Sequence, residues 1–189
     1  MQPDVERELI RKCRSGEHRF FEPLVRAYEV AGLRLAVAML GNIEDAEDVL
    51  QEAFLKAYSS LESFEDGKPF GPWFFQILRN RCRDQLRRRK ARFARELLDE
   101  PDPATTIASD ATHPERIRQK NAARELLWRG LGEISADHRE VIVLKELQGF
   151  RYGEIGEMLG VPEGTVASRL FNARTALRDA IIRLGGRDT

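Results

Sequence analysis

The residues best suited to chemistry in this sequence are a run of basic side chains between positions 79 and 95. They are Arg79, Arg81, Arg83, Arg87, Arg88, Arg89, Lys90, Arg92 and Arg95. A single acid, Asp84, interrupts them. Like charges crowded on one helix repel one another unless a polyanion is present, so the run indicates a nucleic-acid contact.

Turn-forming and aromatic residues precede this run. Positions 64–72 contain Gly67, Pro69, Gly71 and Pro72, which predict a loop that opens into a helix over 73–92. Arginines beside aromatic rings and a loop suit single-stranded DNA, because guanidinium groups hold the backbone while bases stack or enter pockets.

The periodicity of this helix predicts which of its side chains are buried. The inward face would be Phe74, Ile77, Leu78, Cys82 and Leu86, and the side chains left largely outside would be Arg79, Asn80, Arg83 and Arg87. The alternative is that Trp73, Phe74 and Phe75 are all core and the arginines only solvate a surface.

A purely acidic block lies earlier, with Glu44, Asp45, Glu47, Asp48 and Glu52. Apolar residues at steps of three and four over 42–61 predict one long amphipathic helix. Acids near its start are favoured by the helix dipole, and Asn42 can cap it, so a purely structural role stays open. Leu55 falls off the apolar stripe beside Asp48, Gln51 and Glu52, which makes it a candidate anchor for a protein interface.

A third pattern near the C-terminus predicts a helix-turn-helix. Two helices, 152–159 and 163–183, are separated by Gly160, which permits a sharp turn, and by Pro162, which keeps Val161 extended. The second helix would bury Val166, Leu170, Ala173 and Leu177 and turn its opposite side to the DNA major groove. That side carries Ala167, Ser168, Phe171, Asn172 and Thr175, with Arg169, Arg174 and Arg178 at its margins for phosphates.

Length and composition limit the fold class and the number of domains that can carry these three segments. The chain has 189 residues, 42% hydrophobic and 33% charged, with a net charge of zero that conceals the segregation of charge along the chain. Its Leu, Ala, Arg and Glu content favours an all-α protein of two small domains. Further helices are expected over 4–13, 19–40, 122–130 and 136–147, and the Pro-containing, acidic stretch around 96–110 predicts a flexible linker over 95–117.

Other classes of protein find little support in the sequence. Two cysteines without a Cys-x-x-Cys pair and three scattered histidines give no metal-ligand cluster, and Cys13 and Cys82 are expected to be reduced thiols. We find no nucleophile–base pair or phosphate loop, so we expect neither catalysis nor a cofactor. The absence of a long apolar run and of a basic-then-apolar N-terminus predicts a cytoplasmic protein that does not insert into membranes.

Three stretches together resemble the extracytoplasmic-function (group IV) sigma factors of the sigma-70 family. They are GNIEDAEDVLQEAFLKAYSSLESF, FGPWFFQILRNRCRDQLRRR and YGEIGEMLGVPEGTVASRLFNARTAL. The resemblance implies a region 2-like domain over 1–94, a linker over 95–117 and a region 4-like helix-turn-helix domain over 118–189. It also implies promoter recognition and transcription initiation in a bacterial cytoplasm.

The resemblance assigns roles to residues as well. The first stretch would bind the clamp helices of the β and β′ subunits of core RNA polymerase through Asp48, Gln51, Glu52 and Leu55. Melting and capture of the minus-ten element of promoter DNA would involve Ser63, Phe64, Lys68, Phe70, Arg79, Asn80 and Arg83. Contacts to the minus-thirty-five duplex would come from Thr165, Ala167, Ser168, Arg169, Phe171, Asn172 and Arg174.

Relatives of this kind are usually held inactive by an anti-sigma factor, so we expect such a partner and a stress-responsive set of genes. Two other interpretations stay open. One is a conventional regulator that binds duplex DNA and uses its N-terminal domain to sense a ligand or dimerise, but it has no evident use for 48–55 or 64–92. The other is a helical protein-interaction bundle, which predicts no salt-dependent DNA binding.

Overall fold

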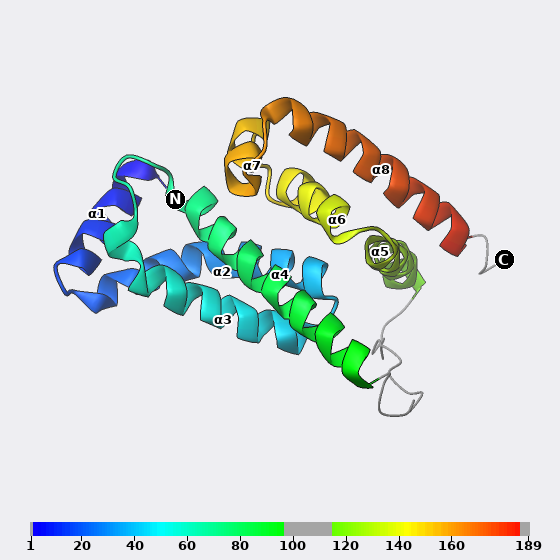
Figure 1. The fold of residues 1–189 in the computed structure, drawn as a ribbon, viewed down its shortest axis with the longest axis horizontal. Helices are drawn as coiled ribbons and strands as arrows, with labels where there is room; N and C mark the ends of the chain where they lie inside the picture. The colour runs from blue at the N-terminus through cyan, green and yellow to red at the C-terminus, as the bar shows by residue number, and fades with distance from the viewer. Residues whose placement is uncertain (1, 97–114, 186–189) are drawn as a thin grey trace.

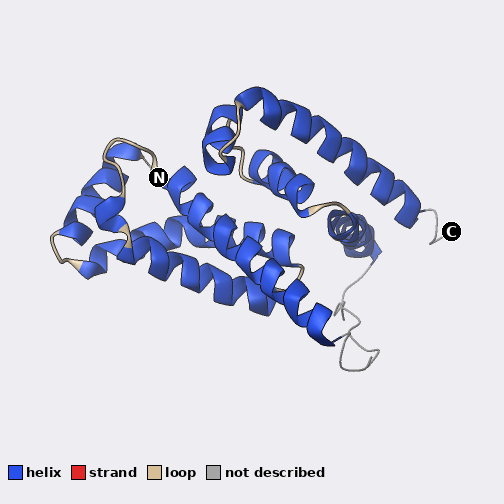
Figure 2. Ribbon diagram, in the orientation of Figure 1, coloured by secondary structure: helices blue, strands red, loops and turns tan. Residues whose placement is uncertain are grey.

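The computed structural model describes residues 2–96 and 115–185, and every regular element among them is a helix (Figure 2). The helices form two domains that lie side by side (Figure 1). This confirms the expected all-α fold of two small helical domains. The expected linker over 95–117 lies mostly outside the described residues; the helices that flank it end at Glu96 and begin at Glu115.

The first domain is built from four α-helices. They are α1 (Pro3–Arg14), α2 (Glu22–Leu40), α3 (Ile43–Ser59) and α4 (Phe70–Glu96), with short 3-10 turns at His18–Phe21 and Leu61–Ser63. Helices α2, α3 and α4 pack against one another, and α1 lies across one end of them (Figure 1). Pro23 occupies the first turn of α2, where its missing N–H is harmless.

The second domain also contains four α-helices. They are α5 (Glu115–Glu133), α6 (Ala136–Ile142), α7 (Tyr152–Leu159) and α8 (Glu163–Gly185). A π-helical turn, η3 (Val143–Leu147), continues α6. Helix α8 packs against α5, α6 and α7, so the domain is assembled around it.

Helix boundaries follow the local sequence signals closely. The Asn42 side chain accepts a hydrogen bond from the Asp45 N–H at 3.1 Å and caps α3, as expected. Gly41 and Gly160 end α2 and α7 with φ of 74° and 65°, a left-handed conformation that glycine adopts without steric cost.

The start of α4 differs from the sequence prediction. The helix begins at Phe70 and not at Trp73, so the loop is shorter than 64–72. Pro72 stands in the first turn, where proline removes no helical hydrogen bond. The Phe70 N–H instead lies 3.4 Å from a carboxylate oxygen of Glu6 on α1.

The core of the first domain is rich in aromatic rings. Phe70, Phe74 and Phe75 are at most 2% exposed, and the Phe54 and Phe74 rings stack with centroids 4.4 Å apart. The expected inward face of α4 is confirmed at Phe74, Leu78 and Cys82. This packing fixes which side of α4 faces away from α2 and α3.

That side of α4 meets the second domain. Helix α4 packs against α7, and α2 packs against α6 and η3. The Phe75 and Phe150 rings lie 5.1 Å apart, the Gln148 amide donates to the Ala31 carbonyl at 3.0 Å, and Arg139 Nη1 donates to the Met39 carbonyl at 2.9 Å. The two domains are therefore in direct contact.

Candidate protein and nucleic-acid interfaces

The outer face of α3 presents an apolar side chain among polar ones. Leu55 is 63% exposed, and Asp48, Gln51 and Glu52 are exposed around it. An isolated exposed leucine is ordinary, but this one stands on a helix whose other face is fully packed in the core. The four residues predicted as a polymerase contact thus share one accessible surface.

Other acids of the same block serve the structure. Asp45 is 3.5 Å from Arg89 and accepts a hydrogen bond from Gln85 at 3.3 Å, which ties the start of α3 to α4. Glu52 lies 3.8 Å from Arg81, a weaker pair at a half-exposed position. The acidic block therefore contributes both to packing and to the exposed face.

The DNA contacts predicted around the loop before α4 fall into an exposed group and a buried group. Ser63 and Lys68 are exposed, whereas Phe64 and Phe70 are 5% and 0% exposed and pack in the core. The Phe64 ring lies 4.9 Å from the Trp73 ring and 6.0 Å from the Phe70 ring. In this conformation the two phenylalanines support the loop from inside, and only the polar members can meet a ligand directly.

Arg14 on α1 holds this loop in place, a role that the sequence did not reveal. Its guanidinium group donates to the carbonyls of Leu61 and Phe64 and to the carboxylate of Asp66, at 2.9 Å for Leu61 and 2.7 Å for Asp66. Nothing in the local pattern of α1 marks Arg14 among its basic neighbours, because its partners lie about 50 positions later.

The basic side chains of α4 are less free than the sequence suggested. Arg79 was expected outside, but its side chain is 13% exposed and forms an ion pair with Glu140 of α6. This expectation was wrong because the partner lies in the other domain, which the periodicity of one helix cannot show. Arg79 Nη1 also donates to the Met158 carbonyl at 3.3 Å and to the Asn80 side chain at 3.2 Å.

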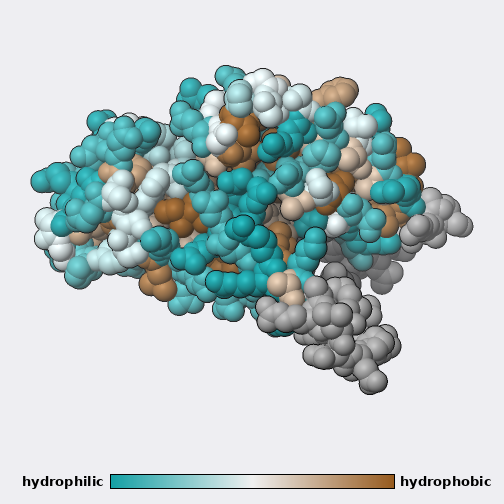
Figure 3. Space-filling model, in the orientation of Figure 1, coloured by the Kyte–Doolittle hydropathy of each residue, from teal (hydrophilic) through white to brown (hydrophobic). Residues whose placement is uncertain are grey.

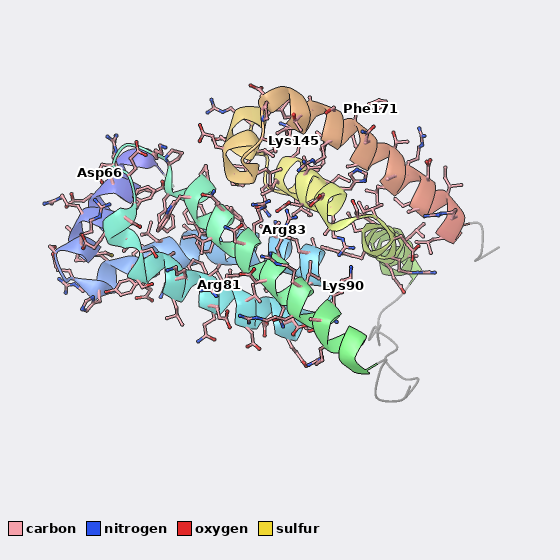
Figure 4. The ribbon with its side chains drawn as sticks, in the orientation of Figure 1. Asp66, Arg81, Arg83, Lys90, Lys145 and Phe171 are labelled. Carbon is pink, nitrogen blue, oxygen red and sulfur yellow. The ribbon has the colours of Figure 1, made fainter. Side chains whose placement is uncertain are left out.

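Arg83 faces the second domain as well. It lies between α4 and α6 (Figure 4) and is 3.1 Å from Asp137 and 3.4 Å from Glu140. Asn80 and Arg87 are exposed as expected, although Arg87 pairs with Asp84. The predicted single-strand face is thus partly occupied by carboxylates of the other domain.

Glu140 is the central residue of this contact, and sequence reasoning missed it. It is 1% exposed, and burial raises the pKa of its carboxyl while the charges of Arg79 and Arg83 oppose that rise. One signal was available: Glu140 lies four positions before the buried Leu144, hence on the inward face of α6.

The helix-turn-helix is confirmed at α7 and α8. Val166, Leu170 and Ala173 are fully buried, and the exposed side carries Ala167, Ser168, Phe171 and Asn172. Phe171 is 71% exposed and projects from the outer side of α8 (Figure 4). Thr165 and Arg169 are half-buried at the edge of this face.

Arg174 is engaged within the protein. Its guanidinium group pairs with Glu146 of η3, with Nε at 3.2 Å from the carboxylate. A phosphate contact by Arg174 would therefore compete with Glu146, whereas Arg169 borders the exposed face of α8. The face itself is polar apart from Phe171 and Ala167, as a major-groove surface requires.

Two other kinds of site are absent from the residues that the structure describes. Within residues 2–96 and 115–185 no group of three or more His, Cys, Asp or Glu could hold a metal ion, and no helix there is long and apolar enough to cross a membrane. The face of the molecule in Figure 3 is largely hydrophilic, with scattered apolar patches.

Comparison with known proteins identifies both domains. Residues 24–92 match the family model described as Sigma-70 region 2, and residues 124–177 match Sigma-70, region 4. The ECF RNA polymerase sigma factor SigW of Bacillus subtilis (strain 168) is 31% identical over 179 residues, covering 91% of this chain and 94% of that protein. The ECF RNA polymerase sigma-E factor of Escherichia coli (strain K12) is 30% identical over 183 residues, covering 94% of each.

Two solved structures share the fold over most of the chain. CnrH in complex with the cytosolic domain of CnrY has a TM-score of 0.69 at 26% identity and covers 95% of this chain and 99% of CnrH. The sigma factor RpoE in complex with the anti-sigma factor NepR from Bartonella quintana has a TM-score of 0.64 at 26% identity, covering 85% of this chain and 97% of RpoE.

Proposed function

Because this chain belongs to the extracytoplasmic-function sigma factors of the sigma-70 family, we propose that it directs core RNA polymerase to promoters and opens the DNA there. It is a transcription initiation factor, and sigma factors are not enzymes. Its partners are core RNA polymerase and promoter DNA, and it works in the bacterial cytoplasm.

The observation that carries the proposal is the exposed leucine on α3. Leu55 is 63% exposed within the segment that matches region 2, surrounded by Asp48, Gln51 and Glu52. An apolar side chain ringed by charged ones has the anatomy of an interface centre with a polar rim. We assign this face to the clamp helices of the β and β′ subunits.

The DNA contacts would lie on two separate surfaces. The exposed face of α8, with Ser168, Phe171 and Asn172, would read the minus-thirty-five element as duplex, with Arg169 holding a phosphate. The loop of residues 60–69 and the start of α4 would capture the melted minus-ten strand, with Ser63, Lys68 and Asn80 as the accessible contacts. We accordingly propose a region 2-like domain over 1–94 and a region 4-like domain over 118–189.

An anti-sigma factor is the expected inhibitor. The RpoE structure that resembles this chain is a complex with the anti-sigma factor NepR. A partner that covers both domains would hold the chain away from polymerase until a stress signal releases it. The genes under its control would then form the response to that stress.

A titration with core RNA polymerase tests the proposal. We expect tight one-to-one binding by the wild-type chain and loss of that binding in Leu55→Asp, because a buried charge would replace the apolar anchor. Val5→Asp is the matched control, since Val5 is 47% exposed on α1, away from α3. A folded chain that does not bind the polymerase, or a Leu55→Asp variant that binds normally, would contradict the assignment.

A further inference from the structure

The second domain presents acidic side chains to the basic face of the first. Asp137 and Glu140 lie on α6, and Glu157 lies on α7. Glu140 pairs with both Arg79 and Arg83, and Asp137 is 3.1 Å from Arg83. Asp137 and Glu140 occupy positions at which a nucleic-acid strand would offer phosphates to the same arginines.

The central pair is too well enclosed to be an ordinary surface ion pair. The side chains of Glu140 and Arg79 are 1% and 13% exposed. The Phe75–Phe150 ring contact and the Gln148–Ala31 hydrogen bond join the same two domains. Since a charge so buried is costly without its partner, the two domains must separate before Arg79 can bind another anion.

The loop before α4 is covered by the same domain. A hollow beside it is lined by Ser63, Lys68 and Trp73 of the first domain and by Glu157 and Met158 of α7. The pKa of Lys68 is raised mainly by its hydrogen bond to Glu65, and the charge of Glu157 adds to the rise. A base entering this hollow would lie against α7 and approach the carboxylate of Glu157.

The two other proposed contact surfaces stay accessible in the same conformation. Leu55 is 63% exposed on α3, and Phe171 is 71% exposed on α8. Domain closure therefore covers the single-strand site and leaves the polymerase and duplex surfaces open.

We propose that the acidic face formed by Asp137, Glu140 and Glu157 is a substitute for nucleic acid that closes the minus-ten site in the isolated chain. The inference rests on the proposed function, because it takes the loop and α4 as the single-strand site. It orders the steps of initiation. The accessible α3 face binds polymerase first, separation of the domains follows, and single-strand capture comes last.

The fraction of molecules with separated domains sets how strongly the isolated chain binds single-stranded DNA. The apparent affinity of the isolated chain for single-stranded DNA equals its intrinsic affinity multiplied by the open fraction. Removing the Glu140 charge leaves Arg79 buried without a counter-charge when closed, which disfavours closure. We expect Glu140→Gln to strengthen single-strand binding by about tenfold or more at low salt.

The test is a fluorescence anisotropy titration of the full-length chain with fluorescein-labelled single-stranded DNA of mixed sequence. Glu133→Gln is the matched control, because it removes one carboxylate from the same domain at an exposed position outside the contact. Gln148→Ala is a second releasing variant, which loosens the contact without changing charge. Both Glu140→Gln and Gln148→Ala should bind the strand more tightly than the wild type, and Glu133→Gln should not.

Glu140→Gln also makes the chain more positive, which by itself could strengthen DNA binding. Measuring the distance between the domains distinguishes this charge effect from separation of the domains. Fluorophores attached through cysteines at positions 44 and 182, both exposed, report the distance between α3 and α8. Glu140→Gln and Gln148→Ala should lower the energy transfer, whereas Glu133→Gln should keep the wild-type value. The inference would be overturned if the wild type bound single strands as tightly as both variants and the energy transfer were the same in all three.

Promoter opening by the chain bound to core polymerase distinguishes failure of the domain closure from failure of the proposed function. With core polymerase present, the wild type and Glu140→Gln should open promoters equally, because polymerase has already separated the domains. If neither opens DNA, the proposed function fails. If both open it and the isolated chains do not differ, only the closure is refuted.

Discussion

At the scale of single residues, the surroundings of each side chain on α8 indicate what it can contribute. Phe171 and Ser168 stand on the exposed face, whereas Arg174 is already paired with Glu146. Arg169 borders the face at a half-buried position. We therefore propose that Phe171 and Ser168 read bases and that Arg169 binds a phosphate.

This division predicts different outcomes for two substitutions. Arg169→Ala should weaken promoter binding almost uniformly across sequences and lower the slope of log affinity against log salt by about one unit. Phe171→Ala should instead change the preference between promoter sequences by roughly 1 to 3 kcal/mol. Duplex titrations at several salt concentrations measure both, and the reverse pattern would refute the division.

The residues that were predicted correctly from sequence are those whose role depends on one helix. Leu55 is exposed and Cys82 is buried, as helical periodicity required. Arg79 differs because its environment is set by Glu140, which lies 61 positions later in another domain. Phe64 and Phe70 were proposed as DNA contacts, but both are core side chains in this conformation.

At the scale of elements, α1 acts as a clamp on the loop that precedes α4. Arg14 bonds to three points of the segment from Leu61 to Asp66, and Glu6 accepts from Tyr28 and from the first N–H of α4. A loop held at both ends keeps its backbone ordered before DNA arrives, which lowers the entropy cost of binding.

Arg14→Ala tests the clamp. Two partly buried carbonyls would lose their donor, so the free energy of unfolding should fall by about 1 kcal/mol. Urea denaturation measures this loss, and faster hydrogen exchange at residues 61–66 should accompany it. Arg11→Ala is the control, because Arg11 bonds only to Glu8 within α1 at an exposed position and should cost little.

The glycines of α7 make a matched pair for the helix-turn-helix. A Cβ at position 156 would meet the Val161 carbonyl oxygen at 2.7 Å, whereas nothing lies within 4 Å of one at position 153. Gly153→Ala should therefore stabilise the second domain by about 1 kcal/mol, through helix propensity alone. Gly156→Ala should destabilise it, because the turn cannot close on the helix.

Thermal unfolding followed by circular dichroism distinguishes the two variants. Gly153→Ala should raise the midpoint of unfolding of the second domain and Gly156→Ala should lower it, with the first domain unaffected. Equal shifts in both would mean that the close approach of α7 and the turn carries no constraint.

Element prediction from sequence succeeded where caps and periodicity agree. Asn42 caps the start of α3 and Gly160 ends α7, as expected. The start of α4 was missed because a proline signals a loop or a first helical turn equally well. The choice between them depends on Glu6, which is distant in sequence.

At the scale of the whole molecule, the net charge of zero arises because acidic and basic surfaces balance, and several of these surfaces face each other. Basic α4 faces acidic positions on α6, and the acidic start of α3 is tied to Arg89. Chain length, composition and the Pro-containing linker predicted the two domains but not their contact, because each domain has its own core and the contact adds no periodic signal. The motifs nonetheless identified the family without any structure.

The most direct test of the central claim is promoter-specific transcription. Core RNA polymerase would be supplied with the purified chain and with genomic DNA from the organism that encodes it, and the 5′ ends of the transcripts mapped. A sigma factor predicts new start sites preceded by one shared pair of minus-ten and minus-thirty-five sequences. Transcription that starts at the same places with and without the chain would contradict the account.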